Sequence, residues 1–154
     1  EKIKKFIYKK IKTINHLKKD VKFHLNKKNS FFFGIFVKKD KIHIGNIKFD
    51  PINKYRNFFW LGILIGNKLY RGKGIGKNVI NKSIIWMFKE KKIHSIFLVV
   101  KKNNKMAIQL YKNCKFKILK TLNGTNEYLM FRKNPRITLN QIRRINNFKE
   151  VYEK

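Results

Sequence analysis

Cysteine, acidic residues and long apolar runs are scarce in this chain, and each shortage narrows what the protein can be. The single cysteine, Cys114, excludes an internal disulfide framework and is compatible with a reducing compartment, so we expect a cytoplasmic protein. Apolar stretches such as Phe58–Ile65 have the length of a strand and are too short for a transmembrane helix. The four histidines show no metal-ligand spacing, so no metal site is expected.

Acidic residues number only 8 against 39 lysines and arginines, which gives a formal net charge of +31. Such a balance normally indicates a nucleic-acid or anionic-membrane partner. The basic residues are mainly lysines spread over the whole length, and they accompany many Asn, Ile and Phe residues. All four residue types have A/T-rich codons, so a biased genome explains much of the excess. Because no arginine stripe, aromatic RNA-binding motif or zinc-finger spacing occurs, we do not expect specific nucleic-acid binding; a non-enzymatic module for RNA or membrane surfaces stays the alternative.

Length and hydrophobic content indicate one domain. The chain has 154 residues, of which 43% are hydrophobic, and its 14 phenylalanines supply ample material for a core. No internal repeat and no second domain is visible, so residues 1–154 are expected to form a single domain, as a monomer or a homodimer.

Hydrophobic periodicity predicts a mixture of helices and strands, that is, an α/β (α+β) class. Residues 2–27 carry apolar positions at near-helical spacing and predict one or two amphipathic helices. The tail at 138–152 repeats apolar residues on one face and predicts a C-terminal amphipathic helix, while 51–57 reads as a polar loop. Strands are expected at 31–37, 42–49, Phe58–Ile65, 95–100, 115–121 and 128–132, and helices at 75–91 and 104–113.

The segment Arg71-Gly72-Lys73-Gly74-Ile75-Gly76 carries the strongest functional signal. It lies between the strand expected at Phe58–Ile65 and the helix expected at 75–91. Three glycines in five residues let the backbone turn tightly and present bare N–H groups. The helix that follows adds its unpaired first-turn donors and the positive end of its dipole. Such a strand–turn–helix arrangement is an anion cradle, most often for phosphate.

Three phosphate-binding patterns compete for this turn, and two fail on spacing. A Walker A loop needs four residues between its glycines, whereas Gly72 and Gly76 are separated by three, and Lys77 is not followed by Ser or Thr. A dinucleotide fingerprint needs a third glycine where Lys77 stands. The third pattern, R/Q-x-x-G-x-G/A, is the acyl-CoA pyrophosphate loop of the GNAT N-acetyltransferases. Arg71, Gly74 and Gly76 match it at every fixed position.

A second motif follows at the expected distance. Residues 104–116 resemble the GNAT pattern N-x-x-A-x-x-L-Y-x-x-x-G-F, with Lys115 in place of the usual glycine, so we expect the turn that leaves this helix to be built differently. The strands around Gly45 and Gly62 resemble those of the branch that includes the ribosomal-protein N-terminal acetyltransferases. With four motifs in order over about residues 30–133, the chain resembles a GNAT N-acetyltransferase. The matching positions of the second motif are Asn104, Ala107, Leu110, Tyr111 and Phe116.

The resemblance implies a GNAT acyl-CoA N-acyltransferase fold, a mixed central sheet flanked by helices, with the family's first strand and the start of its first helix missing. A targeting segment ahead of Glu1 therefore stays open. The resemblance also implies acetyl-CoA as co-substrate and no metal. The residues that would bind the cofactor lie on the third strand, in the glycine turn and on the helix at 104–113. They are Ile63, Leu64, Ile65, Arg71, Gly72, Lys73, Gly74, Ile75, Gly76, Lys77, Asn104, Ala107 and Tyr111.

The reaction that the resemblance implies is direct attack of a neutral amine on the thioester in a ternary complex. A backbone N–H near Leu64 would stabilise the tetrahedral oxyanion, and Tyr111 would protonate the leaving thiolate; packing on the sheet is the other interpretation of Tyr111. Many relatives carry a glutamate where this chain has Leu61, so the general base stays open, with Asp50 and Glu127 as the nearest carboxylates. A protein N-terminus, an amino sugar or a small metabolite amine fits as acceptor, and the few acidic residues argue against polyamines.

Overall fold

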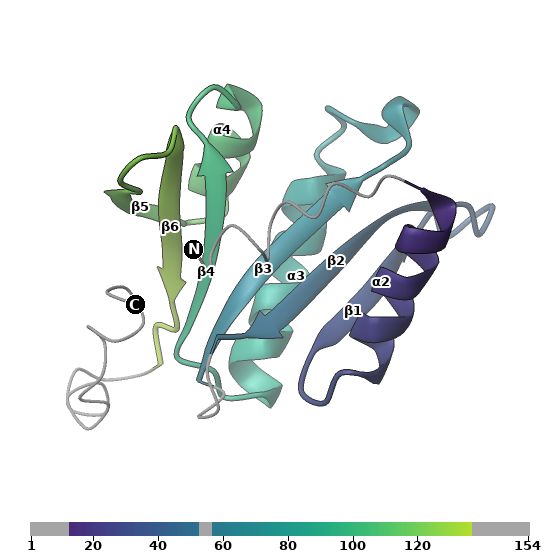
Figure 1. Cartoon of the computed structure of the whole chain (residues 1–154), viewed down its shortest axis with the longest axis horizontal. Helices are drawn as coiled ribbons and strands as arrows, with labels where there is room; N and C mark the ends of the chain where they lie inside the picture. The colour runs from purple at the N-terminus through teal and green to yellow at the C-terminus, as the bar shows by residue number, and fades with distance from the viewer. Residues whose placement is uncertain (1–12, 53–56, 137–154) are drawn as a thin grey trace.

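A six-stranded mixed sheet with helices on both faces makes up the part of the chain that the computed structural model describes, residues 13–52 and 57–136 (Figure 1). The strands lie side by side in the order β1-β2-β3-β4-β6-β5. Their bounds are Phe31–Phe36 for β1, His43–Pro51 for β2, Phe58–Ile65 for β3, Ser95–Lys101 for β4, Lys117–Thr121 for β5 and Glu127–Lys133 for β6. The helices are α2 (Ile14–Asn26), α3 (Ile75–Glu90), α4 (Lys105–Asn113) and the short 3-10 helix η1 (Lys68–Tyr70). This architecture confirms the expected mixed α/β fold class.

Two antiparallel three-stranded halves meet at the centre of the sheet. β1, β2 and β3 form one half, and β4, β6 and β5 form the other. β3 and β4 join the halves and run parallel, because α3 carries the chain back between them. Their pairing covers only three rungs, from Phe58↔Ser95 to Trp60↔Phe97. Beyond these residues the two strands diverge, and the sheet is open at that end (Figure 1).

The main core lies between α3 and one face of the sheet. The buried residues of α3 recur at helical spacing, as the apolar stripe of the sequence predicts. They are Ile80, Ile84, Met87 and Phe88. A smaller cluster around Phe58, Phe97 and Leu129 lies on the opposite face, because successive strand residues point to opposite sides. No helix within the described ranges is long and apolar enough to cross a membrane.

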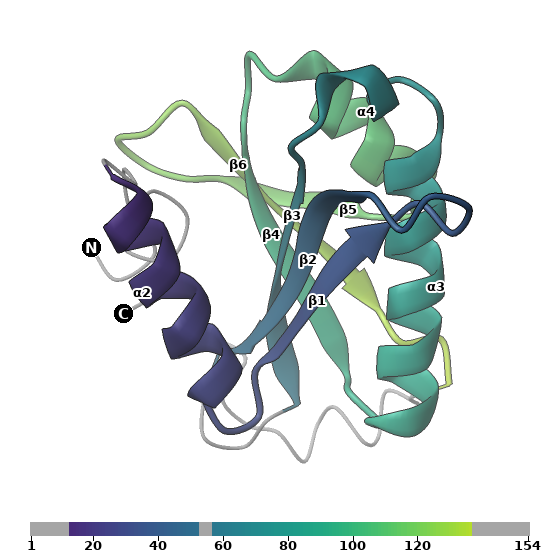
Figure 2. The same ribbon diagram turned by 90° about the vertical axis from the view of Figure 1, so that its right-hand side faces the viewer.

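α2 lies on the face opposite α3, next to β1 and β2 (Figure 2). It begins at Ile14, where the side chain of Thr13 caps it by accepting a hydrogen bond from the N–H of His16. This helix confirms the C-terminal part of the helical pattern predicted over 2–27. Its docking differs from that of α3: among its described side chains only His24 is buried, while Phe23 and Leu25 are exposed. α2 therefore reaches the sheet through a polar residue.

The predicted strand boundaries mostly agree with the structure, and β3 agrees at both ends. The end of β2 differs from the prediction. The sequence pattern predicts that this strand ends at residue 49 and that a loop covers 51–57. β2 instead continues to Pro51, since Asp50 and Pro51 pair with Trp60 and Phe59. A proline is tolerated at a strand end, and the next ladder bond is donated by the N–H of Ile52 to Phe58 O. Residues 2–12 and the tail helix predicted at 138–152 lie outside the described residues.

The turn after α4 corrects one expectation. Lys115 replaces the family glycine, and yet it adopts the left-handed conformation that a glycine would take, with φ at 62°. Phe116 N–H donates to Tyr111 O and Lys115 N–H donates to Lys112 O, which is the hydrogen-bond pattern of a Schellman turn. The expectation that this turn is built differently is therefore wrong. Lys115 thus takes the conformation usual for a glycine at this position of a Schellman turn and carries the strain of that conformation.

Candidate active site

The opening between β3 and β4 exposes one edge of β3. Pairing with β4 ends at Trp60, so the segment from Leu61 to Ile65 has β2 on one side and no strand on the other among the described residues. Leu64, in this segment, has 60% of its surface exposed. An unpaired strand edge presents backbone N–H and C=O groups that a ligand can bind.

The direction of each N–H in this segment follows from the β2–β3 ladder. Ile52 N–H donates to Phe58 O at one end of the ladder, and Gly66 N–H donates to Ile44 O at the other, with unbroken register between. Alternate residues therefore form the hydrogen-bonded pairs, and Leu64 is one of them, opposite Asn46. The N–H of Leu64 thus faces β2, while those of Ile63 and Ile65 face the opening. The donor expected near Leu64 is better assigned to its neighbours.

The glycine turn lies directly after this segment and η1, at the start of α3. Gly72 and Gly74 have φ values of 75° and 74°, and a Cβ added at either would meet nothing within 4 Å. Gly74 is the N-cap residue of α3 and provides no side-chain cap, so the first turn of the helix keeps its donors. Within the described part of the chain, the backbone N–H groups of residues 72–77 donate to no protein acceptor. This geometry is a nest of donors at a helix N-terminus, as an anion requires.

The side chain of Arg71 holds the turn in place. Its Nε donates to Ile65 O at 2.8 Å, and its Nη2 donates to Gly66 O at 3.1 Å. The arginine of the motif thus ties the end of β3 to the turn through backbone carbonyls. A direct contact of its guanidinium with pyrophosphate, which the motif alone suggested, would compete with these two bonds.

Two lysines lie in the turn, and α4 packs against it. Lys73 and Lys77 are exposed, and Lys73 Nζ lies 5.7 Å from the ring centre of Tyr70 in η1. A Cβ added at Gly76 would meet Leu110 of α4 at 3.4 Å, so α4 packs close to the first turn of α3. The turn is therefore cationic on its surface and is backed by α4.

α4 forms the other side of the opening (Figure 1). Asn104 caps it, with its Oδ1 accepting from Ala107 N–H at 3.1 Å. Ala107 and Tyr111 are half-buried and pack against the main core. The Tyr111 ring also packs edge to face on Phe116, with centroids 5.9 Å apart. Asn104 and Ala107 thus have clear structural roles. The ring of Tyr111 packs on Phe116, and this packing is independent of any role of its hydroxyl group in catalysis.

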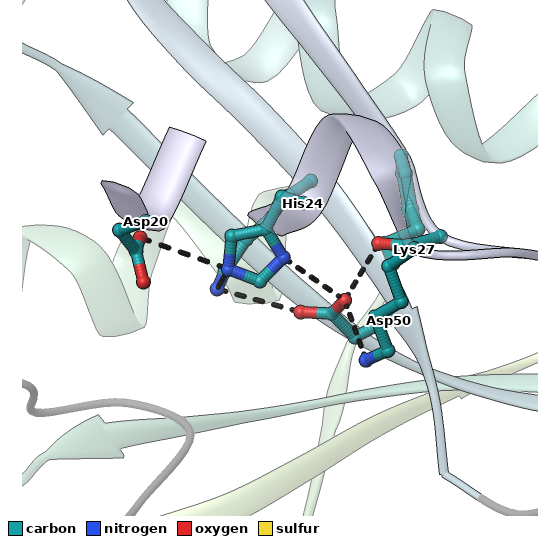
Figure 3. Close-up of polar contacts among 7 residues, drawn as sticks. Asp20, His24, Lys27 and Asp50 are labelled. Atoms are coloured by element: carbon teal, nitrogen blue, oxygen red, sulfur yellow. Dashed lines mark hydrogen bonds and ion pairs between the residues drawn. The ribbon is translucent and has the colours of Figure 1, made fainter. Parts of the chain in front are cut away.

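Asp50, one of the two carboxylates considered as a base, lies at the centre of a buried polar cluster, which we call the Asp50 cluster (Figure 3). Asp50 is 1% exposed. Its Oδ1 accepts from Ser30 Oγ at 2.7 Å and from Lys27 Nζ at 3.2 Å, and its Oδ2 lies 3.4 Å from Lys48 Nζ. His24 contributes Nδ1 at 3.4 Å from Asp50 Oδ1. These contacts fix α2 and the start of β1 to β2.

The charges of this cluster set the protonation of its members. Burial alone would raise the pKa of Asp50, but the Ser30 hydrogen bond and the charges of Lys48, Lys27 and His24 outweigh it, so the pKa is lowered. Burial, together with Lys48, lowers the pKa of His24, against the opposing pull of Asp50 and Asp20. Asp50 is therefore ionised and His24 neutral near pH 7. An enclosed carboxylate with a lowered pKa is a poor general base.

Sequence reasoning missed this cluster. His24 was interpreted as one of four scattered histidines, and Asp50 as a carboxylate without a motif. Alternation in β2 gave no signal for it, because Asp50 shares a face with Asn46 and Lys48, opposite the buried Ile47 and Phe49. Its partners are far away in sequence, and only the fold brings them together. Glu127, the other carboxylate considered, is half-buried at the start of β6 opposite Lys101.

Cys114 is fully buried, and burial raises the pKa of its thiol, which makes it a poor nucleophile. Within the described ranges no group of three or more His, Cys, Asp or Glu residues is placed to hold a metal ion.

Solved structures with this fold include several acetyltransferases. A spermidine N-acetyltransferase from Vibrio cholerae, solved in complex with CoA and spermine, is 22% identical with a TM-score of 0.67; the match covers 79% of this chain and 76% of that one. A ribosomal-protein-S5-alanine acetyltransferase from Vibrio fischeri is 22% identical with a TM-score of 0.64, covering 80% and 72%. A domain from Methanocaldococcus jannaschii is 19% identical with a TM-score of 0.63, covering 76% and 75%. At these identities the likeness concerns the fold.

Among curated proteins, none matches the chain significantly. A family model does: the one described as "Acetyltransferase (GNAT) family" matches residues 6–116, more than half of the chain. The expected family is confirmed, since the match agrees with the opened sheet, the donor-rich turn and the capped α4. The chain belongs to the acetyltransferase (GNAT) family, whose members use acetyl-CoA, and it is an N-acetyltransferase.

Proposed function

We propose that the protein transfers the acetyl group of acetyl-CoA directly to a primary amine while both are bound. The observation that carries this proposal is the continuity of two backbone donor sets: the unpaired edge of β3 leads through η1 into the turn at 72–77. A thioester with a long pantetheine arm and a pyrophosphate needs donors of both kinds in this order. A ternary complex leaves the thioester exposed to the amine with no covalent enzyme intermediate, and buried Cys114 is not suited to form one.

The pyrophosphate is assigned to the N–H groups of Gly72 to Lys77, with Lys73 and Lys77 adding charge at the rim. The pantetheine arm is assigned to the open edge of β3 at Ile63–Ile65 and to the facing side of α4 around Asn104, Ala107 and Tyr111. Arg71 acts in this proposal as the group that holds the turn, through its bonds to Ile65 and Gly66.

The oxyanion of the tetrahedral intermediate is assigned to the N–H of Ile63, which faces the opening at the level where β3 has left β4. Tyr111 is assigned as the acid that protonates the CoA thiolate as the C–S bond breaks. The amine loses its own proton to water or arrives neutral, because the Asp50 cluster is enclosed. A basic module that only binds RNA or membranes would instead show salt-sensitive retention and no response to acetyl-CoA.

Acetyl-CoA is expected to raise the melting temperature of the protein, because a ligand that binds the folded state alone stabilises it by mass action. Gly74→Leu is expected to remove most of that shift, since a side chain would stand in the donor nest. Gly124→Leu is the matched control: Gly124 has φ at 66° and equally open surroundings, but lies in the β5–β6 turn. Both variants should lose about 1–2 kcal/mol of stability from backbone strain. Thermal denaturation with and without acetyl-CoA measures both effects, and an unchanged melting temperature of the folded wild type would remove support for CoA binding.

Tyr111→Phe is expected to lower turnover by about 100-fold while acetyl-CoA affinity changes little, because only the proton for the thiolate is lost. The phenylalanine ring preserves the edge-to-face contact with Phe116 and hence the turn after α4. Tyr128→Phe, in β6, removes a hydroxyl from another half-buried tyrosine and serves as control. Thiol release at saturating acetyl-CoA gives the comparison. Equal turnover of Tyr111→Phe and wild type would assign Tyr111 to packing alone.

A further inference from the structure

The two faces of the opening are unequal. α3 and α4 cover one face, and the donor-rich turn lies at the start of α3 (Figure 2). If acetyl-CoA binds at that turn, as proposed above, it lies on the α3 side, and the acceptor amine reaches the thioester from the other face, which carries α2. The chemical character of this second face therefore selects the acceptor.

Lys48 is the charged residue of β2 that reaches β3 on this second face. It forms a rung with Gly62, inside the segment of β3 that has no strand on its other side. A Cβ added at Gly62 would lie 3.1 Å from both Cγ and Cε of Lys48, so the lysine stem runs across the glycine. The absence of a side chain at 62 gives Lys48 its path over the exposed strand.

The Asp50 cluster fixes the ammonium group of Lys48. Lys48 Nζ lies 3.4 Å from Asp50 Oδ2 and donates to His24 Nε2 at 3.1 Å, which neutral His24 can accept. The Lys48 side chain is nevertheless 26% exposed, whereas that of Asp50 is only 2% exposed. A bound acceptor can thus contact the lysine but not the carboxylate that balances it.

Carboxylates that could receive a polyamine are few on this face. Asp20 of α2 approaches the cluster, 3.7 Å from His24 Nε2, and its side chain is 28% exposed. Of the other described carboxylates, Asp40 lies in the turn between β1 and β2, and Glu90 lies at the end of α3 beside Lys89. Glu127 begins β6 on this face, since it alternates with Leu129, but it is half-buried and lies opposite Lys101. A polyamine carries several positive charges and needs several accessible carboxylates.

We propose that Lys48 recognises an anionic group on the acceptor, so that the acceptor is a primary amine with a carboxylate or phosphate close to it. This inference rests on the proposed acetyl transfer and names the substrate class for it. A charge-assisted hydrogen bond from a held ammonium to such an anion is stronger than one between neutral groups. A second cation brought beside Lys48 would instead be repelled.

The test compares acceptors that differ only in the anion. The comparison of glucosamine 6-phosphate with glucosamine tests recognition of a phosphate. The comparison of a peptide beginning Ala-Glu with one beginning Ala-Gln tests recognition of a carboxylate. Spermidine tests whether a polycation is accepted. For wild type, kcat/KM for the anionic member of at least one pair is expected to exceed that of its neutral partner by roughly tenfold, with spermidine weakest. The pair that shows the difference identifies the anion.

Three variants of the same cluster isolate the role of Lys48. Lys48→Gln should abolish the preference, mainly through the KM of the anionic acceptor, and Lys48→Arg should retain it. Lys27→Gln is the matched control, because Lys27 also contacts Asp50 but belongs to the segment after α2 and not to the rung with Gly62. Both glutamine variants remove one cation from Asp50, so similar losses of melting temperature are expected.

Efficient acetylation of spermidine by wild type, or equal preferences in Lys48→Gln and Lys27→Gln, would overturn the role of Lys48 and leave the acetyltransferase function intact. Absence of transfer to every acceptor, together with no stabilisation by acetyl-CoA, would overturn the proposed function and this inference with it. Melting temperatures of all variants, measured with acetyl-CoA, separate these outcomes from loss of folding.

Discussion

Asp50→Ala is expected to lower the free energy of unfolding at pH 7 by about 3–5 kcal/mol, a large part of the stability of a domain this size. The substitution leaves Lys27 and Lys48 without their shared carboxylate and Ser30 without its acceptor. It also loosens the attachment of α2, whose buried described side chain, His24, lies in the same cluster. Urea denaturation followed by circular dichroism measures the loss.

Asp40→Ala is the matched control for Asp50→Ala, because Asp40 is exposed in the turn between β1 and β2. Surface substitutions of this kind change stability by less than about 0.5 kcal/mol. Similar losses in the two variants would mean that Asp50 contributes no more than a surface charge.

The same cluster predicts how stability depends on pH. The pKa of His24 is lowered from 6.5, so below that pH the unfolded chain binds a proton that the folded chain does not, and stability falls. The pKa of Asp50 is lowered from 3.8, so the stability that its ionised form contributes is present above that pH and is lost as the pH falls further. Wild type should therefore lose stability toward acid in both ranges, and Asp50→Ala should lack the second loss.

Gly45→Ala is the other substitution for which we expect a large effect. A Cβ at residue 45 would lie 2.1 Å from the carbonyl oxygen of Leu64 and 3.0 Å from Cα of Ile65, and both are backbone atoms. β2 and β3 would have to separate where β3 already lacks its second neighbour. We expect a loss of about 3 kcal/mol or more in unfolding free energy and weaker binding of acetyl-CoA, measured by denaturation and by titration.

Gly34→Ala separates this effect from the general cost of changing a strand glycine. A Cβ at Gly34 in β1 would meet Cε2 of Phe36 at 2.5 Å, but that atom belongs to an exposed side chain that can rotate away. A small change in Gly34→Ala beside a large one in Gly45→Ala would support the close approach of β2 and β3. Equal changes would contradict it.

The glycine turn shows which features of the site can be predicted from the sequence and which cannot. Local spacing around Gly74 was enough to predict a strand, a donor-rich turn and a helix, because all three are formed by neighbouring residues. The same spacing could not show that Arg71 donates to the carbonyls of Ile65 and Gly66, since a motif records residue types and not the direction of a side chain. It also could not assign the N–H direction at Leu64, which depends on the register with β2.

The Asp50 cluster marks what pattern reasoning cannot reach. His24, Lys27, Lys48 and Asp50 have no common motif, and their charges are unremarkable in a chain of net charge +31. Only the packing of α2 on β2 turns two of many lysines into partners of one carboxylate. At Lys115 the sequence was misleading for a related reason: the tertiary setting imposes a left-handed backbone that the residue type disfavours.

The short ladder between β3 and β4 divides the sheet into two halves that can move relative to each other. Each half is held by long antiparallel ladders, whereas three rungs and the crossover through α3 hold the halves together. Local opening of the sheet is easiest at this short β3–β4 ladder, so its backbone amide hydrogens should exchange with solvent before those inside either half. A ligand lying along Ile63–Ile65 and against α4 would touch both halves at once. Bound acetyl-CoA would then hold the two halves together, and release of CoA after each turnover would let them separate.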